Sequence, residues 1–202
     1  MKPYRPFLIV IAILIIDQFT KFWVKTHMFL GEEISVTSWF SLHFTENPGM
    51  AFGMVLPGVW GKLFLSGFRL VAVGGGMYFI YYLLKQKAHW GFITAASMIL
   101  AGAIGNMIDG TIYGIIFSDS YMGVARVFPP HGYAGFLQGL VVDMIHVKLP
   151  EITWNGRSHE IFPFIFNVAD ASITTGVFLI LIFQKSFFKE EEAESVTAVE
   201  QN

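Results

Sequence analysis

The sequence predicts a membrane all-α protein with a small β element, in which four transmembrane helices carry outward-facing loops. Hydrophobic residues make up 54% of the 202 residues and charged residues only 14%, and the mean hydropathy is +0.56. Soluble domains rarely combine such values. Four stretches, at about 6–26, 61–84, 91–109 and 162–184, are long and apolar enough to cross about 30 Å of hydrocarbon. We expect residues 1–189 to form a single membrane-embedded domain.

The first apolar stretch follows Lys2 and Arg5, as the core of a secretory signal peptide would. It continues through Asp17 and Lys21 without a cleavage site of small residues. We therefore expect a helix that is retained in the protein.

Basic residues predict the orientation of the spans, because cytoplasmic loops of membrane proteins are rich in Lys and Arg. We expect both termini in the cytoplasm and the loops 27–60 and 110–161 outside, although Lys and Arg residues in or beside those loops weaken the bias. The polar, acidic segment 190–202 is expected to be a disordered cytoplasmic tail. The residues that predict this orientation are Lys2, Arg5, Lys85, Lys87, Lys185 and Lys189.

The two outer loops show signs of short strands. In the first, apolar and polar residues alternate from Phe40 to Thr45, and Asn47-Pro48-Gly49 supplies a turn. The second contains Pro129-Pro130 and then Val141-Val142-Asp143, which favours loop and short strand over another span. A small sheet lying on the membrane is therefore expected.

Composition excludes several classes of function. The net charge of -2 and the absence of a basic cluster argue against a nucleic-acid partner. The chain has no cysteine, which excludes disulfides, cysteine nucleophiles and thiolate metal sites.

Four aspartates, Asp17, Asp109, Asp143 and Asp170, lie in or beside apolar segments. A charged group inside a membrane costs about 2.5–3.5 kcal/mol on insertion scales, so such residues usually serve a function. The third helix should place Asp109 at the outer rim, and the fourth should start from that rim with Asp170. Asp143 and Asp170 could meet there, where one would hold a proton and the other would activate water. That is aspartic-protease chemistry, and it needs no metal.

Five motifs resemble those of the bacterial lipoprotein signal peptidases, the signal peptidase II family. They occur in the family's order between about Asp17 and Ser172. The motifs are Asp17-Gln18-x-Thr20-Lys21, Asn47-x-Gly49-x-Ala51-Phe52-Gly53, Gly105-Asn106-x-x-Asp109, Val141-Val142-Asp143 and Asn167-x-Ala169-Asp170.

This resemblance implies a four-helix aspartyl endopeptidase of the inner membrane with a periplasmic β-cradle and active site. Such an enzyme removes the signal peptide from prolipoproteins just before a diacylglyceryl-modified cysteine. It implies Asp143 and Asp170 as the catalytic dyad, with no metal or other cofactor. Prolipoproteins and membrane lipid are then the expected partners, and we expect a monomer.

The resemblance also implies that Asn47, Asn106, Asp109 and Asn167 surround the substrate and the dyad. Asn167 alone would also fit a helix N-cap. Asp109 would fit an interfacial residue at a helix end. Asp17, several turns inside the first helix, is expected to be a structural ion-pair or hydrogen-bond partner.

The chain departs from the family pattern in two places. The family usually has arginine directly after the third motif, where this chain has Gly110. We propose that Arg69 in the second helix pairs with Asp17 or Asp109 and supplies part of the missing charge, with snorkelling to the interface as the alternative. The second departure is a long insertion between Asp109 and Asp143, which is a lid, a substrate-selecting flap or a tolerated outer loop.

Two other functions compete with this prediction. Asp143 and His146 with His131, His159 or Glu160 could bind a metal, although the chain has no His-Glu-x-x-His helix. Intramembrane carboxylates also serve proton-coupled transporters and carriers. Acidic groups gathered at one face make a poor permeation path, and no internal repeat of the transporter kind is evident.

Overall fold

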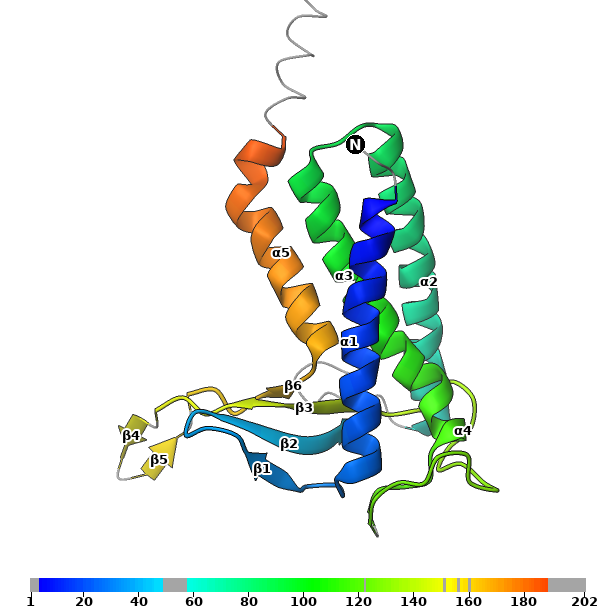
Figure 1. Ribbon diagram of the computed structural model, residues 1–202, viewed down its shortest axis with the longest axis vertical. Coiled ribbons are helices and arrows are strands. Elements are labelled where there is room, and N and C mark those ends of the chain that lie inside the picture. The colour runs from blue at the N-terminus through cyan, green and yellow to red at the C-terminus, as the bar shows by residue number, and fades with distance from the viewer. Residues whose placement is uncertain are drawn as a thin grey trace, which may run out of the picture.

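The computed structural model describes residues 4–48, 58–121, 123–150, 152–155, 157–159 and 161–188. Within these residues, four helices are long and apolar enough to cross a membrane, and a small antiparallel sheet lies at one end of them (Figure 1). The predicted class, a membrane all-α fold with a small β element, is confirmed. The long helices are α1 (Arg5–His27), α2 (Gly58–Lys85), α3 (Trp90–Ile108) and α5 (Val168–Phe187).

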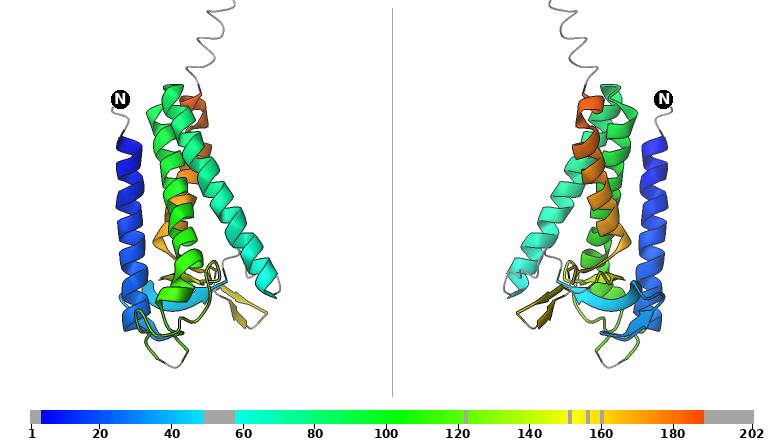
Figure 2. Two further views of the ribbon diagram at one scale, coloured as in Figure 1. Left: turned by 90° about the vertical axis from the view of Figure 1, so that its right-hand side faces the viewer. Right: turned by 90° about the vertical axis from the view of Figure 1, so that its left-hand side faces the viewer.

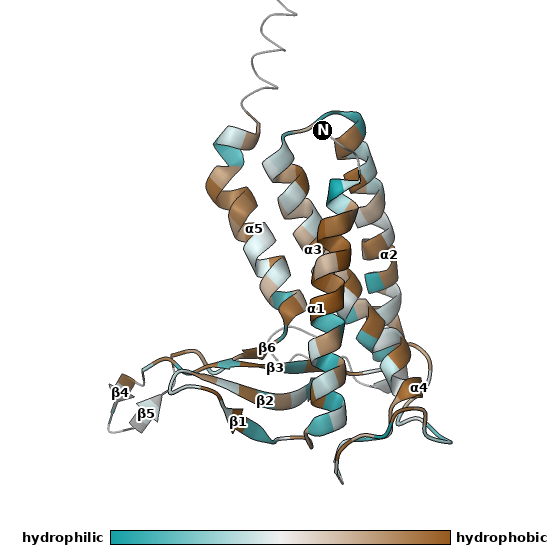
Figure 3. Ribbon diagram, viewed as in Figure 1, coloured by the Kyte–Doolittle hydropathy of each residue, from teal (hydrophilic) through white to brown (hydrophobic). Residues whose placement is uncertain are grey.

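The apolar residues of the bundle face outward as well as inward, as expected of helices surrounded by lipid. Side chains such as Phe19 on α1 and Val71 on α2 are 70% and 76% exposed. The hydropathy colouring shows the same apolar character along the upper part of the helices (Figure 3). Inside the bundle, Val10, Val73, Ile80, Ile93 and Leu100 form a core that joins α1, α2 and α3.

Small residues bring α5 close to α3. A Cβ atom on Gly102 would lie 2.2 Å from the backbone oxygen of Ala169, and one on Gly176 would lie 2.7 Å from that of Ala95. Only glycine permits such a close approach of two helix backbones. The contact fixes the first turn of α5, which carries Asp170, against α3.

The sheet crosses the end of the bundle that lies away from the start of α1, and two further views show the same arrangement (Figure 2). Its antiparallel strands have the order β1-β2-β3-β6. In the register of β2 with β3, Thr45 faces Asp143 and Asn47 faces Val141. A separate two-stranded sheet pairs β4 with β5. The strands are β1 (Glu33–Ser35), β2 (Phe40–Asn47), β3 (Val141–Val147), β4 (Ile152–Trp154), β5 (Arg157–His159) and β6 (Ile165–Phe166).

A second core attaches the sheet to the bundle. Val24 and Met28 at the end of α1 pack with Phe44 of β2 and Met144 of β3, and Phe117 joins them from the segment after α3. All five side chains are almost completely buried. The strands are therefore held against α1 rather than attached only through their loops.

The helical path continues beyond α3 and then turns back. Asp109–Tyr113 forms a five-residue π-helical turn, and α4 (Gly114–Ile116) follows it. The returning chain is bonded to this segment, since the backbone nitrogen of Gly139 donates to the oxygen of Gly110 at 2.9 Å. A Cβ atom on Gly139 would lie 2.0 Å from the oxygen of Asp109, so only glycine allows this approach. The return path leads directly into β3, and it brings that strand beside Asp109.

The insertion between Asp109 and Asp143 is anchored by Lys25 of α1. Its buried ammonium group donates to the hydroxyl of Ser120 at 2.8 Å and pairs with Glu46 of β2. It also lies 4.6 Å from the centre of the Tyr133 ring, within the range of a cation–π contact. The Lys25 side chain therefore joins α1 to the sheet and to two separate parts of the insertion, at Ser120 and at Tyr133.

Candidate active site

Asp143 lies in the middle of β3 with its side chain buried. Two asparagine amides hold its carboxylate: Asn167 donates to Oδ1 at 2.6 Å, and Asn47 donates to Oδ2 at 3.2 Å. Asn47 comes from the neighbouring strand β2, and Asn167 immediately precedes α5. Strand pairing and a helix start thus fix the position of this carboxylate.

Asp170 lies in the first turn of α5. The side-chain oxygen of Asn167 accepts from the backbone nitrogen of Asp170 at 2.8 Å, so Asn167 is the N-cap of the helix. The amide of Asn106, from α3, donates to Oδ1 of Asp170 at 2.7 Å. Asn167 also donates to the side-chain oxygen of Asn106 at 3.1 Å. These two asparagines link Asp143 and Asp170 in one hydrogen-bond network.

The environment of Asp143 favours its protonated form. Burial and then the negative charge of Asp170 raise the pKa of Asp143 to about 7, against the opposing effect of the hydrogen bonds from Asn47 and Asn167. Two neighbouring carboxylates of this kind hold one proton between them near neutral pH. The pair can then provide a base and an acid in the same site.

Lys21 of α1 lies at the centre of the buried charges. Its Nζ atom is 3.0 Å from Oδ2 of Asp17 and 2.8 Å from Oδ2 of Asp109, and it donates to the side-chain oxygen of Asn106 at 2.9 Å. All four side chains are buried. A cation with these partners offsets much of the cost of keeping two further carboxylates out of water.

The two supporting aspartates also hold the backbone next to the dyad. Oδ1 of Asp17 accepts from the backbone nitrogen of Ala169 at 2.9 Å, immediately before Asp170. Oδ2 of Asp109 accepts from the backbone nitrogen of Val142 at 3.2 Å, immediately before Asp143. Asp17 therefore positions Asp170, and Asp109 positions Asp143, each through the backbone of the preceding residue.

Arg69 of α2 lies over Gly110. A Cβ atom on Gly110 would be 3.4 Å from Nη1 of Arg69. The guanidinium group is electrostatically attracted to Asp109, Asp170 and Asp143. A cation from another helix thus occupies the neighbourhood of the position where the family usually has arginine.

The residues of the alternative metal site do not gather around Asp143. His146 is three residues further along β3, so its side chain points to the opposite face of the sheet. His131 is exposed in the insertion, and His159 belongs to β5 in the other sheet. Glu160 lies outside the described residues, as do residues 49–53 of the second motif and the tail 190–202.

Sequence reasoning did not assign a role to Lys21, Gln18 or Lys25. The signal for Lys21 was its spacing, because residues four apart on a helix are neighbours and Asp17 precedes it by four. Gln18 donates to Oδ1 of Asp109 at 2.9 Å and accepts from the hydroxyl of Tyr113 at 3.1 Å. No local pattern indicates such a contact across about 90 residues of sequence.

Comparisons with known proteins agree on one family. The family model described as "Signal peptidase (SPase) II" matches residues 9–186. A lipoprotein signal peptidase of Porphyromonas gingivalis is 42% identical over 183 residues, covering 86% of this chain and 80% of that protein. That of Chlorobium phaeobacteroides is 30% identical over 184 residues, covering 90% and 96%.

Solved structures show the same fold. A bacterial membrane enzyme determined by the in meso method at 2.3 Å resolution superposes with a TM-score of 0.59 and 25% sequence identity, covering 90% of this chain and 88% of the other. A second such structure, at 1.9 Å resolution, gives a TM-score of 0.57 and 26% identity, with 88% and 90% covered.

Proposed function

The chain belongs to the signal peptidase II family, and on that premise we propose that Asp143 and Asp170 are the catalytic dyad with which it acts. It is a multi-pass membrane protein and an aspartic peptidase that removes signal peptides from lipoproteins. The proposal rests above all on the two asparagines that link these carboxylates in a buried network.

The dyad works by sharing one proton. The ionised carboxylate takes a proton from a water molecule as that water attacks the carbonyl carbon of the scissile peptide bond. The protonated carboxyl donates a hydrogen bond to the carbonyl oxygen and later supplies a proton to the leaving amine. The raised pKa of Asp143 supports this division of roles near neutral pH.

The substrate is a prolipoprotein that carries a diacylglyceryl-modified cysteine, and cleavage takes place just before that cysteine. The acyl chains and the signal helix keep this substrate in the membrane, so it reaches the enzyme by lateral diffusion. The dyad lies where β3 meets the start of α5, at the sheet end of the bundle. Asp143 is buried, and the partly exposed Asp170 is the member of the pair through which water enters the site. The proposal puts the enzyme in the bacterial inner membrane, with both termini in the cytoplasm and the sheet in the periplasm.

Asn substitutions at each aspartate test the dyad with little change in shape. Asp143→Asn and Asp170→Asn should each lower kcat on a diacylglyceryl-modified prolipoprotein by at least about 100-fold, the usual lower range for losing a general acid or base. Asp119→Asn, at an exposed aspartate of the insertion, is the matched control and should keep full activity. Thermal unfolding in detergent verifies that each variant is folded. A folded Asp143→Asn or Asp170→Asn variant that cleaves at the rate of the unmodified enzyme would refute the assignment.

A chelator separates this mechanism from metal-dependent hydrolysis. Cleavage by an aspartic dyad should be unchanged after treatment with EDTA. Loss of cleavage in EDTA by enzyme whose Tm is unchanged, restored by a divalent cation, would instead support metal-assisted hydrolysis.

A further inference from the structure

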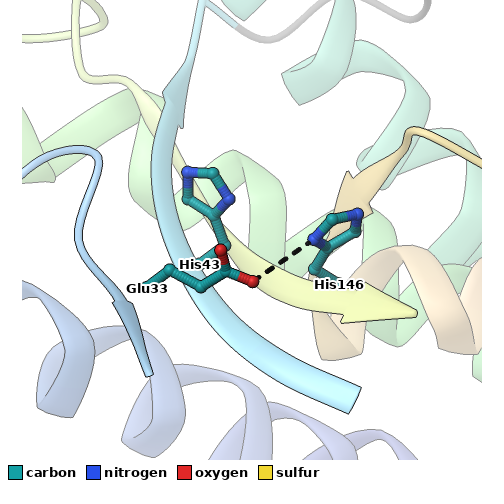
Figure 4. Close-up of side chains that lie close together, drawn as sticks. All are labelled: Glu33, His43 and His146. Atoms are coloured by element: carbon teal, nitrogen blue, oxygen red, sulfur yellow. Dashed lines mark ion pairs between the residues drawn. The ribbon is translucent and has the colours of Figure 1, made fainter. Parts of the chain in front are cut away.

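Three side chains from three neighbouring strands meet on the sheet: Glu33 of β1, His43 of β2 and His146 of β3 (Figure 4). One ligand atom of each lies within 4.8 Å of the other two. Nδ1 of His146 is 3.8 Å from Oε1 of Glu33, and the two imidazole rings have their centres 6.0 Å apart. The proposed peptidase mechanism uses none of these residues.

The strand register explains why residues so far apart in sequence come together. Glu33 is the cross-strand partner of His43, and Ser41 is the partner of His146. Ser41 and His43 are two residues apart on β2, so they point to the same face. The register shifts between Leu42 and Thr45, which leaves His43 and Phe44 opposite the single residue Met144. Two residues opposite one is the arrangement of a β-bulge, which redirects side chains locally.

This face is the one opposite to the proposed dyad. Asp143 and His146 are separated by three positions on β3, and an odd separation places side chains on opposite sides of a strand. A ligand bound at His146 would therefore not touch Asp143. The ligand would bind on the other face of β3, the strand that carries Asp143.

We propose that Glu33, His43 and His146 bind a late first-row divalent cation, with Zn²⁺ as the preferred ion. Two imidazoles and one carboxylate are a donor set that suits Zn²⁺, whereas Ca²⁺ and Mg²⁺ prefer oxygen donors. Three protein ligands leave the fourth position of a tetrahedral site for water. Zn²⁺ requires shorter ligand distances than the cluster now has, and the partly exposed Glu33 side chain can move to provide them.

Glu33 already has a cationic partner that the metal would replace. Nζ of Lys148 is 2.6 Å from Oε1 of Glu33, and the Ser41 hydroxyl donates to the same oxygen at 2.5 Å. The Lys148 side chain is 36% exposed, so it can turn into water when a metal takes its place. The Ser41 hydroxyl remains to orient the carboxylate, as an outer hydrogen bond does in many metal sites.

The bound ion would tie β1, β2 and β3 together. Because β2 carries Asn47 and β3 carries Asp143, the ion would stiffen the part of the sheet that positions the dyad without entering the reaction. The structure therefore assigns it a stabilising role, separate from catalysis.

Metal titration tests the site directly. The full chain, purified with a histidine-free affinity tag and freed of metal with chelator, is titrated with ZnCl₂ in a calorimeter. We expect one saturable site and a rise in Tm with Zn²⁺, and no effect of MgCl₂ at equal concentration. Co²⁺ should give the visible absorption of a tetrahedral complex.

Matched variants identify the ligands. His43→Gln, His146→Gln and Glu33→Gln should each weaken Zn²⁺ binding by more than about 100-fold, beyond the loss caused by removing an outer hydrogen bond. His131→Gln, at an exposed histidine elsewhere, should bind as the unmodified chain does. Lys148→Met should tighten binding, because it removes the competing cation.

Two results would overturn the proposal: no saturable Zn²⁺ binding by the unmodified chain, or unchanged affinity in the His43→Gln variant. His43 is only partly buried, so its variant stays informative even if substitution of the buried His146 prevents folding. Both results are independent of cleavage, so they do not bear on the dyad.

Discussion

Asn167 donates a hydrogen bond of 2.6 Å to Oδ1 of Asp143, although Asp143 lies in β3 and Asn167 immediately precedes α5. The same side chain caps α5 by accepting from the backbone nitrogen of Asp170 at 2.8 Å. One residue therefore fixes the start of the helix that presents one aspartate and the orientation of the other. Its two roles can be separated by mutation.

Asn167→Ser should keep the cap and lose the amide donor, whereas Asn167→Ala should lose both. Serine caps helices about as well as asparagine, so the serine variant should be more stable than the alanine variant by about 1 kcal/mol. Both should lower kcat by roughly 10-fold or more, because each loses the hydrogen bond that positions the Asp143 carboxyl group. Thermal unfolding and cleavage assays measure the two effects. A serine variant with full activity would show that the amide is not needed.

Lys21→Met should destabilise the fold strongly. The substitution leaves Asp17 and Asp109 buried without their shared cation, and breaking such a buried pair costs about 3–5 kcal/mol. Lys185→Met, at an exposed lysine of α5, is the control and should unfold with nearly unchanged Tm. Adding Asp109→Asn to Lys21→Met should destabilise by less than the sum of the single effects, since the two side chains interact. Additive losses would argue against the network.

The raised pKa of Asp143 predicts a pH-dependent stability. Its pKa is about 7 in the fold and near 3.8 ordinarily, so between these values the folded state binds more protons than the unfolded state. The resulting stabilisation is complete below about pH 4 and is lost as pH rises through about 7, with a total of up to about 4 kcal/mol. Asp143→Asn should remove this dependence. The free energy of unfolding of the unmodified enzyme and of Asp143→Asn is measured by chemical unfolding at pH 5 and pH 8. An equal change with pH in the two proteins would contradict the raised pKa of Asp143.

Arg69→Met should lower cleavage by about tenfold or reduce Tm, because the guanidinium group balances the negative charges of Asp109, Asp143 and Asp170. Adding Gly110→Arg should restore part of the loss by returning a cation to the same neighbourhood. Lys87→Met, outside the membrane-spanning helices, is a charge-matched control. Full activity and unchanged Tm in Arg69→Met would eliminate this role.

Hydropathy and local pattern were enough to predict the class of fold, because a membrane-spanning helix is recognised from a stretch of about 20 apolar residues. The alternation around Phe40 likewise indicated β2. What the sequence could not supply was the path of the chain after Asp109. That segment is held by backbone bonds between residues far apart, such as Gly139 with Gly110, and these bonds leave no local pattern.

The candidate site could likewise be predicted only in part from the sequence. The cost of burying charge singled out the four aspartates, and the family motifs paired Asp143 with Asp170. The use of Asp17 and Asp109 as acceptors for Ala169 and Val142 depends on contacts between α1, α3, α5 and β3 that only the folded chain provides. The sequence indicated which charged residues cost free energy to bury, but not which backbone N–H groups they bind.

The sheet joins strands from distant parts of the chain, with β3 between β2 and β6. During synthesis, β2 therefore emerges long before its partner β3, and Asp143 is made before the helix that carries Asp170. With the proposed dyad, the enzyme becomes active only after α5, its last long helix, has been made. A nascent chain that still lacks α5 contains only one aspartate of the proposed dyad, so it could not cleave the signal peptides of other proteins.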